Sequence, residues 1–187
     1  MKLILASNSP RRKQILIDMG LEFEVIPSNY DEKLLDDIFS YEKIEDLATQ
    51  KCLDVVRRVK DGEIVLAADT VVVLHNKILG KPHSKQEAFE MLKSLSGVTH
   101  SVVTSVCAIN TKTNRAALLS TTSYVRFTEW TDEMIHCYID EFNPLDKAGS
   151  YGIQELPKNY LDKFEGSFEN IVGLAPESVR AVLNQIK

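Results

Sequence analysis

The sequence predicts an α/β fold, and two observations lead to that class. Residues 2–6 have the pattern of a short buried strand, residues 10–20 that of a helix, and residues 22–26 alternate like a strand. Two longer segments, 98–109 and 116–127, are rich in β-branched residues and are joined by a polar loop, which predicts a long hairpin. Helix and strand therefore alternate at the start of the chain, and sheet dominates its middle.

Further helices and strands are expected between and after these segments. Ser84 and Glu87 have the spacing of a capping box, which marks the start of a helix, and Thr131 is expected to cap a later one. No internal repeat or low-complexity tract divides the chain, so its 187 residues, 1–187, are expected to form one domain. In chain order we expect a helix over 44–60, a strand over 64–68 that ends at Asp69, a strand over 71–74, helices over 84–95 and 131–142, a polar loop over 143–150, and a last helix from Pro176.

The composition limits the class of partner. A formal charge of -5 and a sequence pI near 5.4 disfavour a general binder of nucleic acid or of membrane surfaces, because such partners favour a basic surface. Any cationic site must therefore be local. The three cysteines are odd in number and form no Cys-x-x-Cys pair, which indicates neither a disulfide framework nor a zinc site. No signal-peptide pattern and no run of about 20 apolar residues is present, so we expect a cytoplasmic protein.

The turn Ser7-Asn8-Ser9-Pro10-Arg11-Arg12 has the features of an anion site. Ser9 can cap the first helix and Pro10 suits its first position, yet two arginines follow in the first turn. Cations there oppose the helix dipole, unless an anion lies between the helix amides and the guanidinium groups. Phosphate is the obvious anion, and the alternative is that both arginines are solvated.

Two carboxylates could hold a divalent cation. Asp69 stands where an apolar run stops, at the carboxyl end of a strand, where open α/β sheets usually place their sites. Glu32 lies in an acidic pair after the second expected strand. Together with phosphate oxygens, these side chains would suit Mg²⁺ or Mn²⁺. The alternatives are an aspartate that caps a turn and a charged loop.

Three lysines are further candidates for phosphate binding. Lys51 lies four residues from both Leu47 and Val55, on or beside the face of its helix that should be buried. It must therefore meet an anion or extend its stem along the edge of the core. Lys81 follows a strand in Gly-Lys-Pro, and Lys147 lies in a polar loop.

Signatures of other chemistries are missing. No Gly-x-x-x-x-Gly-Lys-Ser/Thr phosphate loop is present, because Gly80-Lys81 is followed by proline and no glycine stands five positions before Gly80. The four histidines lack the spacing of zinc ligands, and there is no Gly-x-Ser-x-Gly elbow. The sequence therefore disfavours P-loop ATPases, zinc enzymes and serine hydrolases.

Six blocks of the sequence stand in register over essentially the whole chain. They are Leu5-Ala6-Ser7-Asn8-Ser9-Pro10-Arg11-Arg12, Ala68-Asp69-Thr70-Val71-Val72, Gly80-Lys81-Pro82, Leu95-Ser96-Gly97-Val98-Thr99-His100, Asp146 to Gln154, and Gly166 to Leu174. Together they resemble the Maf family of nucleotide pyrophosphatases. The resemblance implies an elongated α/β fold with a mixed, twisted sheet flanked by helices and a cleft between two lobes, similar to the inosine triphosphate pyrophosphatases. It also implies hydrolysis of a nucleoside triphosphate between the α and β phosphates, a divalent cation, Mg²⁺ or Mn²⁺, and a homodimer.

The resemblance assigns roles to the same residues. Asp69 matches the family's proton acceptor, Glu32 and Asp69 would bind the metal, and the substrate would contact Ser7, Arg12, Lys51, Lys81 and Lys147. In the family, the residues at three positions differ between members that prefer different bases. Arg11, Thr70 and Gln154 match the dTTP/UTP type, whereas the 7-methylguanosine type has Trp, Gln and Glu at these positions.

The expected reaction is hydrolysis of dTTP and UTP, with modified pyrimidine nucleotides as further substrates. The alternatives are a nucleotide-binding regulator of cell division and a 7-methyl-GTP pyrophosphatase. One departure from the family pattern is Gly173-Leu174-Ala175-Pro176, where Gly-Leu-Pro is usual. It could shift the start of the last helix by one residue, in a segment that we expect not to touch substrate.

Overall fold

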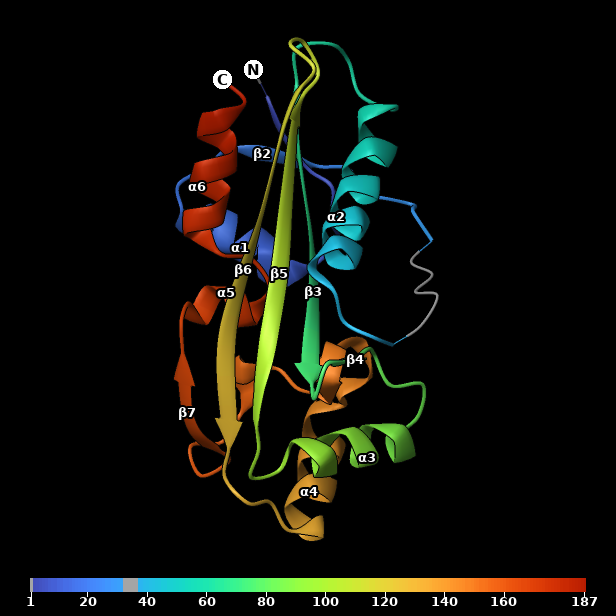
Figure 1. Cartoon of the computed structure of the whole chain (residues 1–187), viewed down its shortest axis with the longest axis vertical. Coiled ribbons are helices and arrows are strands. Elements are labelled where there is room, and N and C mark those ends of the chain that lie inside the picture. The colour runs from blue at the N-terminus through green and yellow to red at the C-terminus, as the bar shows by residue number, and fades with distance from the viewer. Residues whose placement is uncertain (1, 32–36) are drawn as a thin grey trace.

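The computed structural model describes residues 2–31 and 37–187, in which seven strands form one mixed sheet (Figure 1). The strand order is β2-β1-β3-β5-β6-β7, and β4 pairs with β3. β1 is parallel to β2 and β3, whereas the other pairs are antiparallel. The expected mixed sheet and long hairpin are confirmed. The strands are β1 Leu3–Leu5, β2 Phe23–Val25, β3 Ile64–Leu74, β4 Lys77–Leu79, β5 Thr99–Asn110, β6 Arg115–Phe127 and β7 Leu161–Glu165.

Helices cover both faces of the elongated sheet. In Figure 1, α1, α2 and α6 surround the end that carries both termini, and α3 and α4 gather at the other end. Predicted caps are confirmed at Ser9, Ser84 and Thr131, whose side chains each accept from a backbone amide in the first turn. The helices are α1 Pro10–Asp18, α2 Tyr41–Val56, α3 Lys85–Leu95, α4 Asp132–Phe142, α5 Phe168–Val172 and α6 Pro176–Gln185; the 3-10 turns are η1 Pro144–Asp146, η2 Ala148–Ser150 and η3 Ile153–Glu155.

Three helix ends differ from the prediction, whereas the last helix begins where expected. The second helix covers Tyr41–Val56 instead of 44–60, and it starts earlier because Ser40 caps it through the amide of Lys43. The first helix stops at Asp18, and Gly20 follows with a φ of 71°. α6 begins at Pro176 in spite of the unusual residues before it, and Ala175 makes no side-chain cap bond.

β3 is one continuous strand, so the prediction that a strand ends at Asp69 is wrong. Its pairing with β5 runs unbroken through Asp69 and Thr70, which lie opposite Ser105 and Thr104. The other edge of β3 is divided, because β1 pairs only as far as Leu66 and β4 begins at Val72. Asp69 therefore lies just beyond the end of its parallel neighbour β1, and not at the end of its own strand.

Alternation along β3 places its side chains in four apolar clusters, two on each face. Towards α2, Ala67 and Val71 belong to different clusters, and Asp69 lies between them. On the opposite face, Ala68 packs with α1 and α6 and Val72 packs with α3 and α4, with Thr70 between them. On each face of the sheet, one polar side chain, Asp69 or Thr70, thus lies between two apolar clusters.

The loop after α4 packs directly against β3 through Gly149. This residue has a φ of 66°, and its amide donates to the carbonyl of Gly80 over 3.0 Å. A Cβ added at Gly149 would lie 2.8 Å from Cγ2 of Val72. A glycine is needed here for both its backbone conformation and its lack of a side chain.

Gly149→Ala should lower the free energy of unfolding by about 2–4 kcal/mol, because it adds a strained φ to a contact that has no room. Denaturant unfolding measures the change. Gly80→Ala is the matched control, since nothing lies within 4 Å of a Cβ built there. Equal losses from the two substitutions would show that the close approach to Val72 is not the reason for Gly149.

A buried histidine joins β5 to the segment that follows this loop. His100 is 2% exposed, and its Nε2 lies 2.7 Å from the hydroxyl of Tyr151. Its ring also packs edge-on against Phe127, with centroids 5.0 Å apart. Burial lowers the pKa of His100 to about 4.

The unfolded chain should therefore bind the His100 proton at higher pH than the folded chain. The stability linked to this histidine is fully present above about pH 6.5. It should fall by about 3 kcal/mol as the pH drops to the folded pKa of about 4. His100→Gln keeps a polar group beside Tyr151 but does not titrate. Unfolding curves between pH 7 and 4 should show a steeper loss for the wild type, and parallel curves would contradict the assignment.

Candidate active site

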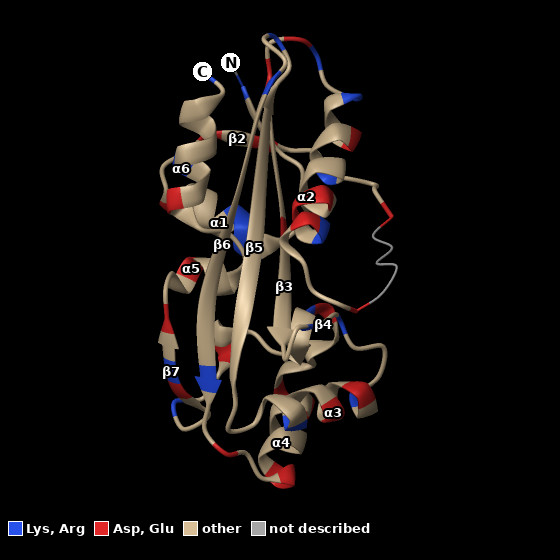
Figure 2. Ribbon diagram, viewed as in Figure 1, with Lys and Arg blue, Asp and Glu red and all other residues tan. Residues whose placement is uncertain are grey.

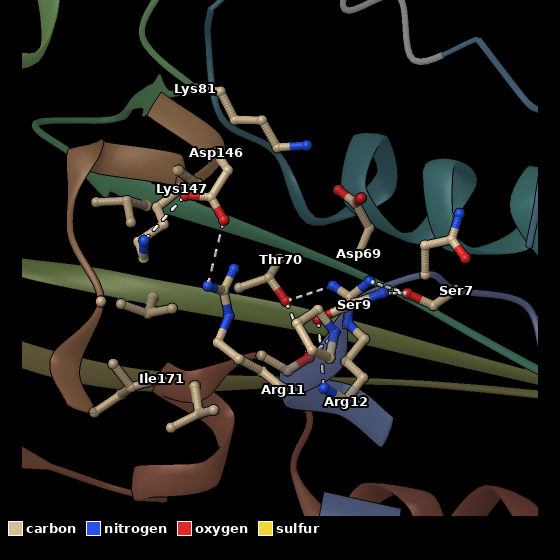
Figure 3. A pocket seen from close by; sticks show the side chains of 18 of the residues that line it. Ser7, Ser9, Arg11, Arg12, Asp69, Thr70, Lys81, Asp146, Lys147 and Ile171 are labelled. Carbon is tan, nitrogen blue, oxygen red and sulfur yellow. Dashed lines mark hydrogen bonds and ion pairs between the residues drawn. The ribbon is translucent and has the colours of Figure 1, made fainter. Parts of the chain in front are cut away.

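A cavity of about 440 Å³ opens beside the divided edge of β3 (Figure 3). It is lined by residues from the turn before α1, from β3, from the loop after α4 and from α5. Nine of the predicted site residues line it, whereas Glu32 lies outside the described residues. The nine are Ser7, Arg11, Arg12, Lys51, Asp69, Thr70, Lys81, Lys147 and Gln154.

The cavity is cationic although the chain is acidic overall. Among its described lining residues, five side chains are lysine or arginine and two, Asp69 and Asp146, are carboxylates. Figure 2 shows the basic residues of α1 at the centre of the molecule, beside the long strands. In a chain of formal charge -5, such a concentration of cations suits an anion with several charges. The expectation of a local cationic site is confirmed.

Asp69 and Lys51 form a buried ion pair on the α2 face of the sheet. β3 directs Asp69 toward α2, where Lys51 lies on the buried side of the helix. The two side chains are 8% and 10% exposed, and Lys51 Nζ donates to Asp69 Oδ1. Of the two alternatives for Lys51, contact with an anion is the one observed. Loss of the Lys51 ammonium group would break this pair and leave the Asp69 carboxylate buried, which typically costs about 3–5 kcal/mol.

Arg12 lies on the opposite face, and three acceptors in the described part of the chain hold it. Its Nε donates to the carbonyl of Gly173 over 2.9 Å, and its two terminal nitrogens donate to Thr70 Oγ1 over 3.0 Å and to Ser7 Oγ over 3.4 Å. Ser9 accepts from the amide of Arg12 as the cap of α1. The alternative of a solvated side chain is wrong for Arg12, because tertiary hydrogen bonds fix its guanidinium group at the cavity.

Arg11 and Lys147 meet at a carboxylate that the sequence did not single out. Asp146 Oδ2 lies 3.7 Å from Arg11 Nη1, and Asp146 Oδ1 lies 3.0 Å from Lys147 Nζ. Lys147 is 8% exposed and also lies 3.3 Å from Oε2 of Glu155. Burial opposes the charge on Asp146, but the hydrogen bond from Lys147 and the charges of Lys147 and Arg11 outweigh it and hold the pKa of Asp146 below its usual value.

The remaining predicted residues lie at the rim. Lys81 and Gln154 are exposed and reach the cavity from the segment after β4 and from η3. Gly173 was missed, although it borders the cavity and its carbonyl binds Arg12. The segment that carries Gly173 is thus closer to the site than expected. The local signal in the sequence was the glycine itself, and its φ of 132° is one that favours this residue.

The arrangement combines a buried carboxylate with fixed cations. A carboxylate that faces a cavity can accept a proton from water, and cations around it can stabilise negative charge that develops on phosphate oxygens. Within residues 2–31 and 37–187, no group of three or more His, Cys, Asp or Glu side chains is placed to hold a metal ion. In the same residues, no helix is both long enough and apolar enough to span a membrane.

Comparisons with known proteins agree with this chemistry. The sequence matches the family described as Maf-like protein over residues 2–186. A dTTP/UTP pyrophosphatase from Clostridium perfringens (strain SM101) is 44% identical over 175 residues, which cover 93% of this chain and 91% of the relative. A dTTP/UTP pyrophosphatase from Bdellovibrio bacteriovorus is 39% identical over 187 residues, which cover 98% of this chain and 97% of the relative.

Among solved structures, the Ham1 protein of Staphylococcus aureus is similar, with a TM-score of 0.49 and 13% identity over 97% of this chain and 91% of that chain. The family match spans nearly the whole sequence, and the two bacterial relatives share about 40% of their residues with it. The chain therefore belongs to the Maf family.

Proposed function

We propose that this protein hydrolyses dTTP and UTP to the nucleoside monophosphate and pyrophosphate. The observation that carries the proposal is the cavity in which five cationic side chains accompany the buried carboxylate of Asp69. The negative charges of a triphosphate would match these cationic side chains. The relatives at 44% and 39% identity bear the name dTTP/UTP pyrophosphatase, which agrees with this substrate class.

The triphosphate would bind across the divided edge of β3. Arg12 and Ser7 lie with Thr70 on one face of the sheet, and Lys51 lies with Asp69 on the other. Lys81 and Lys147 line the same cavity (Figure 3). Arginine can donate two parallel hydrogen bonds to phosphate oxygens, and lysine acts as a point charge. These contacts would place the scissile bond near Asp69.

Asp69 would then serve as the proton acceptor. A water oxygen forms a bond to the α phosphorus while the bond between the α phosphorus and the bridging oxygen breaks, and a proton of the water moves to a carboxylate oxygen of Asp69. Pyrophosphate leaves with the bridging oxygen. The lysines and arginines stabilise the charge on the leaving group, because phosphoryl transfer depends mainly on position and electrostatics.

The donor set suits a divalent cation that arrives with the substrate. Mg²⁺ is usually bound by one or two carboxylates together with substrate phosphates, and Asp69 offers such a carboxylate at the cavity. We propose Mg²⁺ or Mn²⁺ at Asp69 and Glu32, of which Glu32 lies outside the described residues. Such an ion would withdraw charge from the scissile phosphate.

Base selection would take place at the rim of the cavity. Gln154 is exposed there, and its amide offers both a donor and an acceptor to the edge of a pyrimidine. Arg11 is half-buried beside Asp146 and lines the same cavity. We also propose that the protein acts as a homodimer in the cytoplasm.

Asp69→Asn should reduce the turnover of dTTP and UTP by about 10²–10⁴-fold, because the amide cannot accept the proton. Pyrophosphate release measures the rate, and calorimetry should show that dTTP still binds. A melting curve checks that the variant, which leaves Lys51 without its carboxylate partner, remains folded. Near-normal turnover by folded Asp69→Asn would be incompatible with its role as proton acceptor.

A panel of nucleoside triphosphates with product identification tests the reaction and the base preference together. We expect pyrophosphate without orthophosphate, and kcat/KM for dTTP and UTP at least about tenfold above the values for purine nucleotides and 7-methyl-GTP. Orthophosphate as the product would exclude cleavage between the α and β phosphates. Tight binding with no turnover in Mg²⁺ or Mn²⁺ would favour a regulator of cell division instead.

Gln154→Glu extends the same panel to base selection. It should lower kcat/KM for dTTP and UTP by about tenfold, because an ionised glutamate has no donor for the base. Gln185→Glu, on the exposed side of α6, is the control for the change in charge. An equal effect of both substitutions on kcat/KM would reject a contact between Gln154 and the base.

A further inference from the structure

Three threonines form a row across the central strands, and the middle one is buried away from the cavity. Thr70 on β3 lies opposite Thr104 on β5, which in turn lies opposite Thr121 on β6. Thr104 is 0% exposed and is not among the residues that line the cavity. A hydroxyl at such a position must find its partners within the protein.

The hydroxyl of Thr104 contacts that of Thr70. The two Oγ1 atoms lie 2.9 Å apart, and Thr104 Oγ1 lies 3.1 Å from the carbonyl oxygen of Asn170, to which it can donate. Thr70 Oγ1 can itself donate to the carbonyl of Gly173 over 3.2 Å. Each hydroxyl has one proton and two lone pairs, so these contacts restrict where the Thr70 proton can point.

The two hydroxyl protons can serve only two of these three contacts at a time, and two arrangements keep the hydrogen bond between Thr70 and Thr104. Thr70 donates to Gly173 and accepts from Thr104, or Thr70 donates to Thr104, which then donates to Asn170. In both, the proton of Thr70 points away from Arg12 and a lone pair remains for the guanidinium group, whose Nη2 lies 3.0 Å away. Thr104 thus fixes the hydroxyl that accepts from Arg12.

The carbonyl of Gly173 belongs to the same network. It accepts from Nε of Arg12 over 2.9 Å and also lies within reach of Thr70. Arg12 is thereby held by α1, β3 and the end of α5 at once. A guanidinium group that is ordered before the substrate arrives loses less entropy when it binds phosphate.

We propose that Thr104 is a positioning residue of the triphosphate site, which acts through Thr70 to orient Arg12. The inference rests on the proposed function for the identity of the anion. It also gives Thr70 a role that differs from a contact with the base: the hydroxyl at this position sets the geometry of a phosphate-binding arginine.

Thr104→Val removes the hydroxyl and keeps the shape of the side chain. Loss of one buried hydrogen bond corresponds to about a three- to tenfold change in an equilibrium constant. We expect the affinity for tripolyphosphate, measured by calorimetry, to fall by about this factor, and KM for dTTP to rise equally while kcat changes by less than about twofold. Thr104→Ser should restore most of the affinity.

Thr121→Val is the matched control. Thr121 stands next in the same row, but its hydroxyl contacts Ser178 on α6 and not the Arg12 network. The substitution can lower the melting temperature and should leave the affinity for tripolyphosphate and KM unchanged. Equal losses of affinity from Thr104→Val and Thr121→Val would mean that Thr104 acts only through stability, and would overturn the proposal.

A double-mutant cycle with Arg12→Lys tests whether the effect passes through the guanidinium group. In that background, Thr104→Val should have no further effect on the affinity for tripolyphosphate, although its effect on the melting temperature persists. Independent, multiplying effects on affinity would overturn the proposal, as would a wild type that does not bind tripolyphosphate. A wild type that binds tripolyphosphate but hydrolyses no nucleotide would refute the pyrophosphatase function alone, since affinity still measures the effect of Thr104.

Discussion

The alternation of side chains along β3 is the constraint on which the site depends. Neighbouring residues in a strand point to opposite faces, so Asp69 is directed to α2 and Thr70 to α1. The edge of β3 between the end of β1 and the start of β4 is open to the cavity at this point. Side chains from both faces of the sheet can therefore reach one ligand around that edge. If β3 were paired along its whole length, the neighbouring strand would separate the two faces.

Asp69 and Thr70 are polar residues in the middle of a long, buried strand, and each side chain requires a partner. Asp69 has the ammonium group of Lys51, and Thr70 has Thr104, the carbonyl of Gly173 and the guanidinium group of Arg12. A buried carboxylate without such partners would destabilise the fold by several kcal/mol. A buried hydroxyl without them would cost about 1–3 kcal/mol. The contacts that stabilise the strand thus also hold the groups that would bind and cleave the substrate.

Patterns local in sequence predicted most of the fold, because caps and alternation act over a few residues. The caps at Ser9 and Thr131 and the long hairpin are present. The break at Asp69 was wrong, since a polar pair within an apolar run resembles a strand end unless its partners on β5 and α2 are known. Likewise, the charge of Lys147 indicated an anion, but its contact with Glu155 depends on two successive 3-10 turns that no local pattern specified.

Carboxylates contact the lysines that would bind phosphate. Lys51 contacts Asp69, and Lys147 contacts Asp146 and Glu155. A triphosphate must compete with these carboxylates for the lysines, so part of its binding free energy is spent on separating existing ion pairs. Arg12 also donates to Thr70, Ser7 and Gly173, which are neutral acceptors and compete less strongly with phosphate than carboxylates do. These hydrogen bonds can therefore keep the guanidinium group oriented while the phosphates displace the carboxylates from the lysines.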